Sequence, residues 1–188
     1  MESKNKNDLT FENMLDSKGL KELVDSLIVE AHELIPKVIA KTKGSDDRAK
    51  EAGAKWIERH RLHVLLDAVE ESSIKLSENI LVEPIFLAEL KATLEVIHRW
   101  HDQPLWKEIE PSLETKTHFT HTISKLHVAE YFQRQGHKVE LFPRGGKKSP
   151  DLKVQAIGST QDWLLVECYQ PQKLHGGQNI LTEKKWIV

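Results

Sequence analysis

Residues 138–172 read KVELFPRGGKKSPDLKVQAIGSTQDWLLVECYQPQ, and this stretch decides the fold class of the C-terminal part. Apolar and polar residues alternate through 139–143 and again through 151–156. Side chains alternate across a strand, so a period of two predicts strands rather than helices. Residues 163–169 are apolar on both faces except for Glu167, which is the pattern of a central strand. We therefore expect three short strands, connected through glycine-containing turns.

Two carboxylates stand out in this stretch. Asp151 follows Pro150 at the start of the second expected strand, and Glu167 interrupts the apolar third strand. A carboxylate inside an apolar run is costly unless it is paired or binds a cation. We expect the two carboxylates to converge on one point, although Asp151 after a proline also fits an ordinary turn.

Segment 149–151 (Ser-Pro-Asp), followed after a hairpin by 166–169 (Val-Glu-Cys-Tyr), resembles the PD-(D/E)XK nuclease superfamily. The core of that family runs helix, three strands, helix, strand. A helix expected over about 122–135 ends at Gly136 before the first strand, in the same order. The resemblance implies a restriction-endonuclease-like α-β-β-β core. Either this core is truncated after the third strand, or the chain is a fragment of a longer protein.

The resemblance also implies a Mg²⁺ or Mn²⁺ site. Asp151 and Glu167 would bind the metal, with the carbonyl of Cys168 as a third ligand, and such oxygen ligands suit Mg²⁺. The metal would help to make a hydroxide from bound water. The family has a lysine two residues after the Glu, where this sequence has Tyr169. Because tyrosine supplies no cation, either another lysine takes that place or the site is inactive.

Lys153 is the expected substitute, because it lies two residues from Asp151 and should share its strand face. Lys173 is the second choice. On the preceding helix, Glu130 is expected as an accessory carboxylate directed at the metal, with His127 beside it. Each of these residues also fits an ordinary exposed position. The expected phosphate contacts, which would add affinity rather than sequence choice, come from three loop residues: Arg144, Lys147 and Lys148.

The composition bounds the class of protein. The chain has 188 residues, of which 39% are hydrophobic and 30% charged, and this balance is typical of a globular protein rather than a disordered one. A single cysteine cannot form an intramolecular disulfide, which fits a reducing compartment. No apolar stretch approaches the length of a membrane span, and the N-terminus has no apolar signal region. We expect a cytoplasmic protein without a membrane partner.

Charge is divided unevenly along the chain. Residues 116–188 contain 11 Lys and Arg against 6 Asp and Glu, a balance of +5, whereas the whole chain has a net charge of −2. Residues 1–115 therefore carry −7. A basic C-terminal part suits an anionic partner, and DNA or RNA is the expected one.

The N-terminal part has the three-and-four spacing of amphipathic helices. After a loose segment, 1–17, a helix is expected over 20–39 with a break at Pro36. Gly44 followed by Ser45-Asp46-Asp47 predicts a stop and a new helix start. The further helices are expected to reach about residue 71 and then to cover 74–81, 85–101 and 105–109.

Residues 18–115 are thus expected to form a helical bundle, joined by a linker at 111–118 to a nuclease-like α/β domain at 116–188. Alternatively, the last helices of the bundle pack on the sheet and the chain forms one domain. Three histidine pairs at a spacing of three lack the further ligands of a zinc site, and we expect them on helix faces: His60/His63, His98/His101 and His118/His121.

Three functions stay open at this point. The first is a metal-dependent nuclease that cleaves phosphodiester bonds in DNA or RNA. The second is a catalytically inactive relative that binds nucleic acid, or a protein partner through its N-terminal helices. The third is a helical interaction protein unrelated to nucleases, in which Asp151 and Glu167 lie far apart. Tyr169 favours the second, and the pair of carboxylates favours the first.

Overall fold

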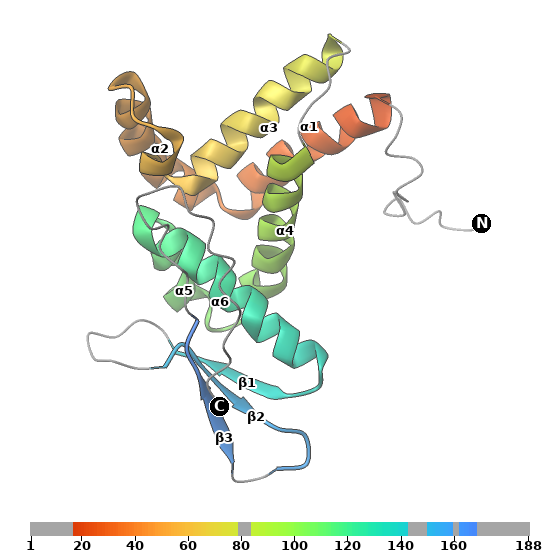
Figure 1. The fold of residues 1–188 in the computed structure, drawn as a ribbon, viewed down its shortest axis with the longest axis vertical. Coiled ribbons are helices and arrows are strands. Elements are labelled where there is room, and N and C mark those ends of the chain that lie inside the picture. Colours follow the sequence, from red (N-terminus) through yellow and green to blue (C-terminus); the bar gives the residue numbers. More distant parts are fainter. Residues whose placement is uncertain (1–16, 79–83, 143–149, 160–161, 169–188) are drawn as a thin grey trace, which may run out of the picture.

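The computed structural model describes residues 17–78, 84–142, 150–159 and 162–168, and it places a group of helices on top of a small sheet (Figure 1). The elements are α1 (Ser17–Leu34), α2 (Pro36–Glu51), the 3-10 helix η2 (Trp56–Glu58), α3 (Arg61–Ser77), α4 (Pro84–His101), α5 (Trp106–Leu113), α6 (Lys116–Arg134), β1 (Lys138–Leu141), β2 (Leu152–Gln155) and β3 (Trp163–Val166). This order confirms the expected α+β class. None of the described helices is long and apolar enough to cross a membrane.

Pro36 breaks the first helical stretch as predicted, because a proline removes a backbone donor and fits the first turn of a helix. It opens α2 directly after Ile35. The predicted stop at Gly44 is wrong, since α2 continues through it to Glu51. The carboxylate of Asp46, expected to cap a helix beginning there, instead accepts from the backbone N–H of His60, 14 residues further on, at 3.0 Å. A local capping signal was therefore used for a tertiary contact.

Two other boundaries differ from expectation. The separate helix expected at 74–81 is the last part of α3, which runs to Ser77. The expected linker at 111–118 is mostly helical, because α5 extends to Leu113 and α6 begins at Lys116. The helix expected from about residue 122 thus begins six residues earlier, and those residues carry Phe119 into the core.

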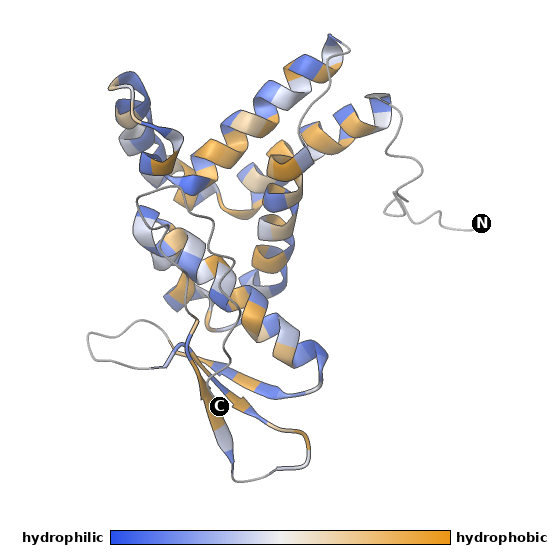
Figure 2. Cartoon of the chain, in the orientation of Figure 1, coloured by the Kyte–Doolittle hydropathy of each residue, from blue (hydrophilic) through white to orange (hydrophobic). Residues whose placement is uncertain are grey.

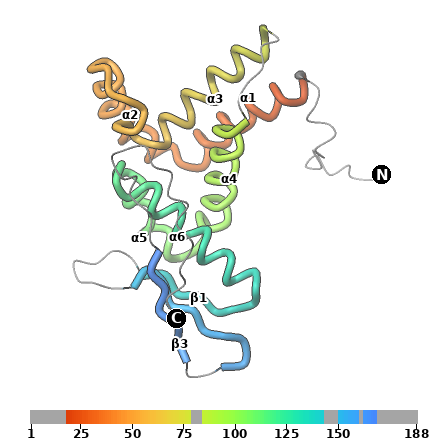
Figure 3. The backbone as a smooth tube through the Cα atoms, viewed as in Figure 1, coloured from red at the N-terminus to blue at the C-terminus, as the bar shows by residue number. Residues whose placement is uncertain are grey.

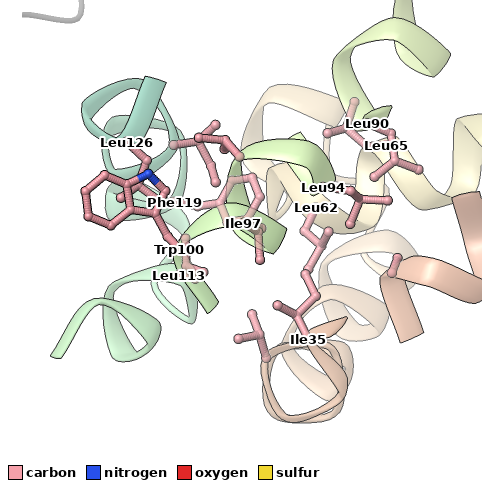
Figure 4. Packing of buried hydrophobic residues seen from close by; sticks show 14 of the residues in the cluster. Ile35, Leu62, Leu65, Leu90, Leu94, Ile97, Trp100, Leu113, Phe119 and Leu126 are labelled. Carbon is pink, nitrogen blue, oxygen red and sulfur yellow. The ribbon is translucent and has the colours of Figure 1, made fainter. Parts of the chain in front are cut away.

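One hydrophobic cluster joins the helices to the sheet. In Figure 4, Phe119 and Leu126 of α6 lie beside Trp100 and Ile97 of α4, and the same cluster continues toward Ile35. The apolar stripes in Figure 2 face this interior while the outer helix surfaces are mainly polar. Helix packing around a shared core is the usual outcome of amphipathic spacing.

The three strands form an antiparallel sheet in the order β1-β2-β3. Leu141 pairs with Leu152 and Leu152 with Val166, so strands that follow one another in the sequence pair antiparallel. Residues 143–149 and 160–161, which lie between these strands, are outside the described residues. In the tube drawing of Figure 3 the chain passes from α6 into β1, and the sheet lies below that helix. The central strand of the described sheet is β2 rather than β3. Leu164 and Leu165 of β3 are exposed accordingly, contrary to the expectation of a buried strand.

Helix α6 covers one face of the sheet, where Leu141, Leu152 and Val154 are buried. The chain turns from α6 into β1 at Gly136, which has a φ of +81°. Glycine adopts this left-handed conformation without a Cβ penalty, so it ends helices in this way. The helix end expected at Gly136 is confirmed, and the turn brings the sheet back against α6.

Candidate functional site

Asp151 directly precedes β2 and lies between the end of β1 and the end of β3. Its carbonyl accepts from the N–H of Phe142 at 3.0 Å, and its own N–H donates to the carbonyl of Val166 at 3.0 Å. Both Asp151 and the following Leu152 are buried. Strict alternation would place one of the two outside, so the regular strand pattern does not extend through Asp151. Its side chain turns toward α6.

Three donors surround the carboxylate of Asp151. Its Oδ2 accepts from the backbone N–H of Cys168 at 2.8 Å. Its Oδ1 lies 3.0 Å from His121 Nε2 and 3.7 Å from Lys125 Nζ, both on α6. Because a carboxylate only accepts, Nε2 is the nitrogen of His121 that carries the proton in this bond. A buried charge is stable when its lost hydration is replaced in this manner.

Lys125 is itself a buried lysine with two roles. Besides its position beside Asp151, its ammonium donates to the carbonyl of Phe142, the residue that follows β1. The group of Asp151, His121 and Lys125, here called the Asp151 cluster, therefore ties α6 to the ends of all three strands. In the sequence, His121 stood out only as part of a histidine pair on a helix face, and Lys125 did not stand out. Their signal is an i, i+4 spacing next to the apolar stripe of the helix that precedes the sheet.

Glu167 does not join this cluster in the described structure. Its neighbours Val166 and Cys168 both pack against the core, so Glu167 between them faces the other side of the sheet and is exposed. Burial raises the pKa of the Cys168 thiol to about 11, which keeps the sulfur protonated at neutral pH. The cysteine is a half-buried thiol packed against the core, and a protonated thiol is a poor nucleophile.

Lys153 lies on the outer face of the sheet, away from Asp151. Its ammonium sits 5.0 Å from the ring centre of Phe142 and 5.8 Å from that of Trp163. The expectation that it shares a face with Asp151 is wrong, because that argument assumed alternation through residue 151. Lys125 from α6 is the lysine beside Asp151.

Glu130 is engaged by two guanidinium groups, Arg99 of α4 and Arg134 of α6, and is buried between them. Its carboxylate thus links two helices. His127, one turn before it, has an exposed side chain. The pKa of His127 is lowered, first by the partial loss of hydration of its ring and then by the positive charge of Arg99. Glu130 was expected to point toward a metal, but its carboxylate pairs with Arg99 and Arg134.

The remaining predicted site residues, Arg144, Lys147, Lys148, Tyr169 and Lys173, lie outside the described residues. Within the described ranges, no group of three or more His, Cys, Asp or Glu side chains is arranged to hold a metal ion. A cavity of about 20 Å³, lined in part by His121 and Lys125, adjoins the Asp151 cluster. This volume has room for about one water molecule.

The outer face of the sheet combines rings with ammonium groups. Trp163 has the ammonium of Lys138 at 5.2 Å from its ring centre, in addition to that of Lys153. Register places these residues together, because Lys138, Gln155 and Trp163 are direct partners across the three strands. Lys138 is exposed, while Phe142, Lys153 and Trp163 are half-buried on this face.

Comparison with known proteins adds no family assignment. No protein-family model matches this sequence, no curated protein matches it, and no solved structure matches its fold.

Proposed function

We propose that this chain is a nuclease-like protein that binds nucleic acid through its C-terminal part without cutting it. The observation that carries the proposal is that groups of the protein itself already contact both carboxylate oxygens of Asp151. These oxygens accept hydrogen bonds from Cys168 N and His121 and form an ion pair with Lys125, and Glu167 faces the opposite side of the sheet. A metal held by both carboxylates at bonds of about 2.1 Å would require a rearrangement of the strand ends.

Two further features support nucleic acid as the partner. Residues 116–188 have a charge balance of +5, which favours a polyanion. The outer sheet face offers Trp163 and Phe142 with Lys138 and Lys153 beside the rings. Surfaces that bind single strands without sequence preference combine aromatic rings for stacking with cations for the backbone.

The test measures binding and cleavage on the same samples. Fluorescently labelled single- and double-stranded DNA and RNA are titrated with the full chain in EDTA, in Mg²⁺ and in Mn²⁺, at several salt concentrations. We expect binding that weakens with salt, does not depend on the metal, and leaves the oligonucleotides intact. Lys153→Met should weaken binding, while Lys75→Met on the surface of α3 serves as the matched control. Absence of binding at low salt would overturn the proposal.

A metal-dependent phosphodiesterase is the second candidate, and the position of Lys125 favours it. Its ammonium, 3.7 Å from Asp151 Oδ1, could stand in for the lysine that Tyr169 replaces in the nuclease pattern. Asp151, Glu167 and the Cys168 carbonyl would hold Mg²⁺, which would activate a water for attack on phosphate. Metal-dependent cleavage by the wild type that is lost in Glu167→Gln, with the helical circular dichroism unchanged, would establish this candidate instead.

A further inference from the structure

A second site lies in the helical part, and none of the residues that line it belongs to the Asp151 cluster. A cavity of about 430 Å³ opens between α2, η2 and the junction of α5 with α6. Ligand sites for small molecules are typically about 300 to 1,000 Å³ in volume. Its rim carries Lys41, Ser45, Glu58, Glu114, Thr115 and Lys116.

The floor of the cavity is fixed by buried polar groups that satisfy one another. Asp46 accepts from His60 N at 3.0 Å and from Arg59 Nε at 3.1 Å. The ring of His60 accepts from Leu62 N at Nδ1 and donates from Nε2 to the carbonyl of Leu113 at 3.1 Å. These bonds hold η2 and the start of α3 against α2 and α5, so the cavity keeps its shape without a ligand.

The rim carries both signs of charge, and only part of it is paired. Lys41 forms an ion pair with Glu114 across the cavity mouth. Among the ion pairs of the described residues, neither Lys116 nor Glu58 takes part in one. Lys116 Nζ donates to the backbone carbonyl of Glu58, and the Glu58 carboxylate accepts from Lys55 N at 3.1 Å. Lys116 and Glu58 thus bring one positive and one negative group to the lining of the cavity, and each forms a hydrogen bond to backbone rather than an ion pair.

We propose that this cavity binds a small zwitterion of the amino-acid class, whose carboxylate pairs with Lys116 and whose ammonium pairs with Glu58. A simple anion would meet Lys116 but would be repelled by Glu58, and a simple cation would have the reverse problem. A zwitterion satisfies both. The hydroxyl groups of Ser45 and Thr115 supply further donors and acceptors at the rim.

Occupation of the cavity would connect α2 with the start of α6. A ligand that binds only the folded state stabilises it by mass action, so binding is expected to raise the unfolding temperature. The inference concerns the helical part and is independent of nucleic-acid binding by the sheet.

The experiment uses the full chain with individual free amino acids as probes. Thermal unfolding and titration calorimetry are measured with each amino acid up to about 10 mM, a range that covers weak millimolar binding. Acetate and methylamine, each carrying one of the two charges, are the matched single-charge probes. We expect at least one amino acid to bind and to raise the unfolding temperature, with neither acetate nor methylamine doing so.

Two variants locate the site. Lys116→Met and Glu58→Gln should each weaken binding of that amino acid by at least about tenfold. Lys75→Met and Glu71→Gln, from an exposed ion pair on α3, should leave it unchanged. The proposal is overturned if no amino acid binds, if acetate or methylamine binds equally well, or if the α3 variants weaken binding as much as the rim variants.

Discussion

A buried carboxylate persists only where donors replace the water that it loses on folding. Asp151 meets this condition through Cys168 N, His121 and Lys125. Glu167, which follows the end of the neighbouring strand β3, is exposed and has no such requirement. The two carboxylates that look equivalent in the sequence therefore differ in what they contribute to stability.

This difference can be measured by neutralising each carboxylate in turn. Asp151→Asn places an amide beside donors that need an acceptor, and we expect it to lower the free energy of unfolding by about 2 to 4 kcal/mol. Glu167→Gln should change it by less than about 0.5 kcal/mol, as for most exposed positions. Urea denaturation followed by circular dichroism compares the two. An Asp151→Asn protein as stable as the wild type would show that the Asp151 cluster does not stabilise the fold.

His60 makes the stability of the helical part sensitive to acid. Burial lowers its pKa from 6.5 to about 4, because charging the ring would cost its hydration, with a further contribution from His63. The unfolded chain takes up this proton below pH 6.5 and the folded chain does not, so stability is lost as the pH falls toward 4.

We expect this group to account for up to about 3 kcal/mol of stability lost between those two pH values. Urea denaturation at a series of pH values should give a shallower dependence for His60→Asn than for the wild type. His98→Asn, at an exposed position of α4, is the control. Equal pH dependence in all three proteins would contradict the role assigned to burial of His60.

At the scale of elements, glycines show why one local signal succeeded and another failed. Gly136 has a φ of +81°, and a Cβ added there would lie 3.1 Å from Ile157 Cδ1. Gly44 lies inside α2, and nothing stands within 4 Å of an added Cβ. The sequence shows the same residue at both places, but only Gly136 needs the left-handed conformation that excludes other residues.

Alanine at the two positions should act in opposite directions. Gly136→Ala is expected to lower the free energy of unfolding by about 1 to 2 kcal/mol, because the Cβ of alanine is unfavourable in the left-handed backbone conformation. Gly44→Ala should raise the free energy of unfolding by about 0.5 to 1 kcal/mol, since alanine has less conformational freedom than glycine in the unfolded chain and loses less of it in the helix. Thermal unfolding of both variants beside the wild type measures the signs. A destabilising Gly44→Ala would mean that α2 is interrupted there, as the sequence had suggested.

At the scale of the whole molecule, α6 belongs both to the helices and to the sheet. Phe119 and Leu126 pack among the helices, while His121 and Lys125 on the same helix reach Asp151. A boundary between residues 115 and 116 would cut through this shared core. Removal of α6 would expose the apolar surface that it buries in the bundle.

We therefore expect one cooperative unfolding transition for the full chain, with the loss of helical circular dichroism and the loss of amide protection in β2 at the same urea concentration. A fragment of residues 1–115 should be less helical than the same residues in the full chain and should unfold without a sharp transition. Two separated transitions, or a stably folded fragment, would establish two independent domains.

The sequence by itself determined the elements that depend on short-range patterns. The break at Pro36, the glycine at the end of α6 and the period-two strands all follow from backbone geometry, so they could be read without a structure. The α+β class follows from their order along the chain. The exposure of β3 could not be read, because the same apolar pattern fits an edge or a central strand until the neighbouring strands are known.

Only the tertiary structure decided the partners of the charged residues. Asp46 lies at a local capping signal but binds His60 N and Arg59, and Asp151, expected from the sequence as a metal ligand, binds His121 and Lys125. Ionic and hydrogen-bonding partners meet through space from positions distant in the chain, and their choice depends on which groups lose water together on folding. For the same reason, only the arrangement of α2, η2 and α6 shows that Lys116 and Glu58 line a common cavity.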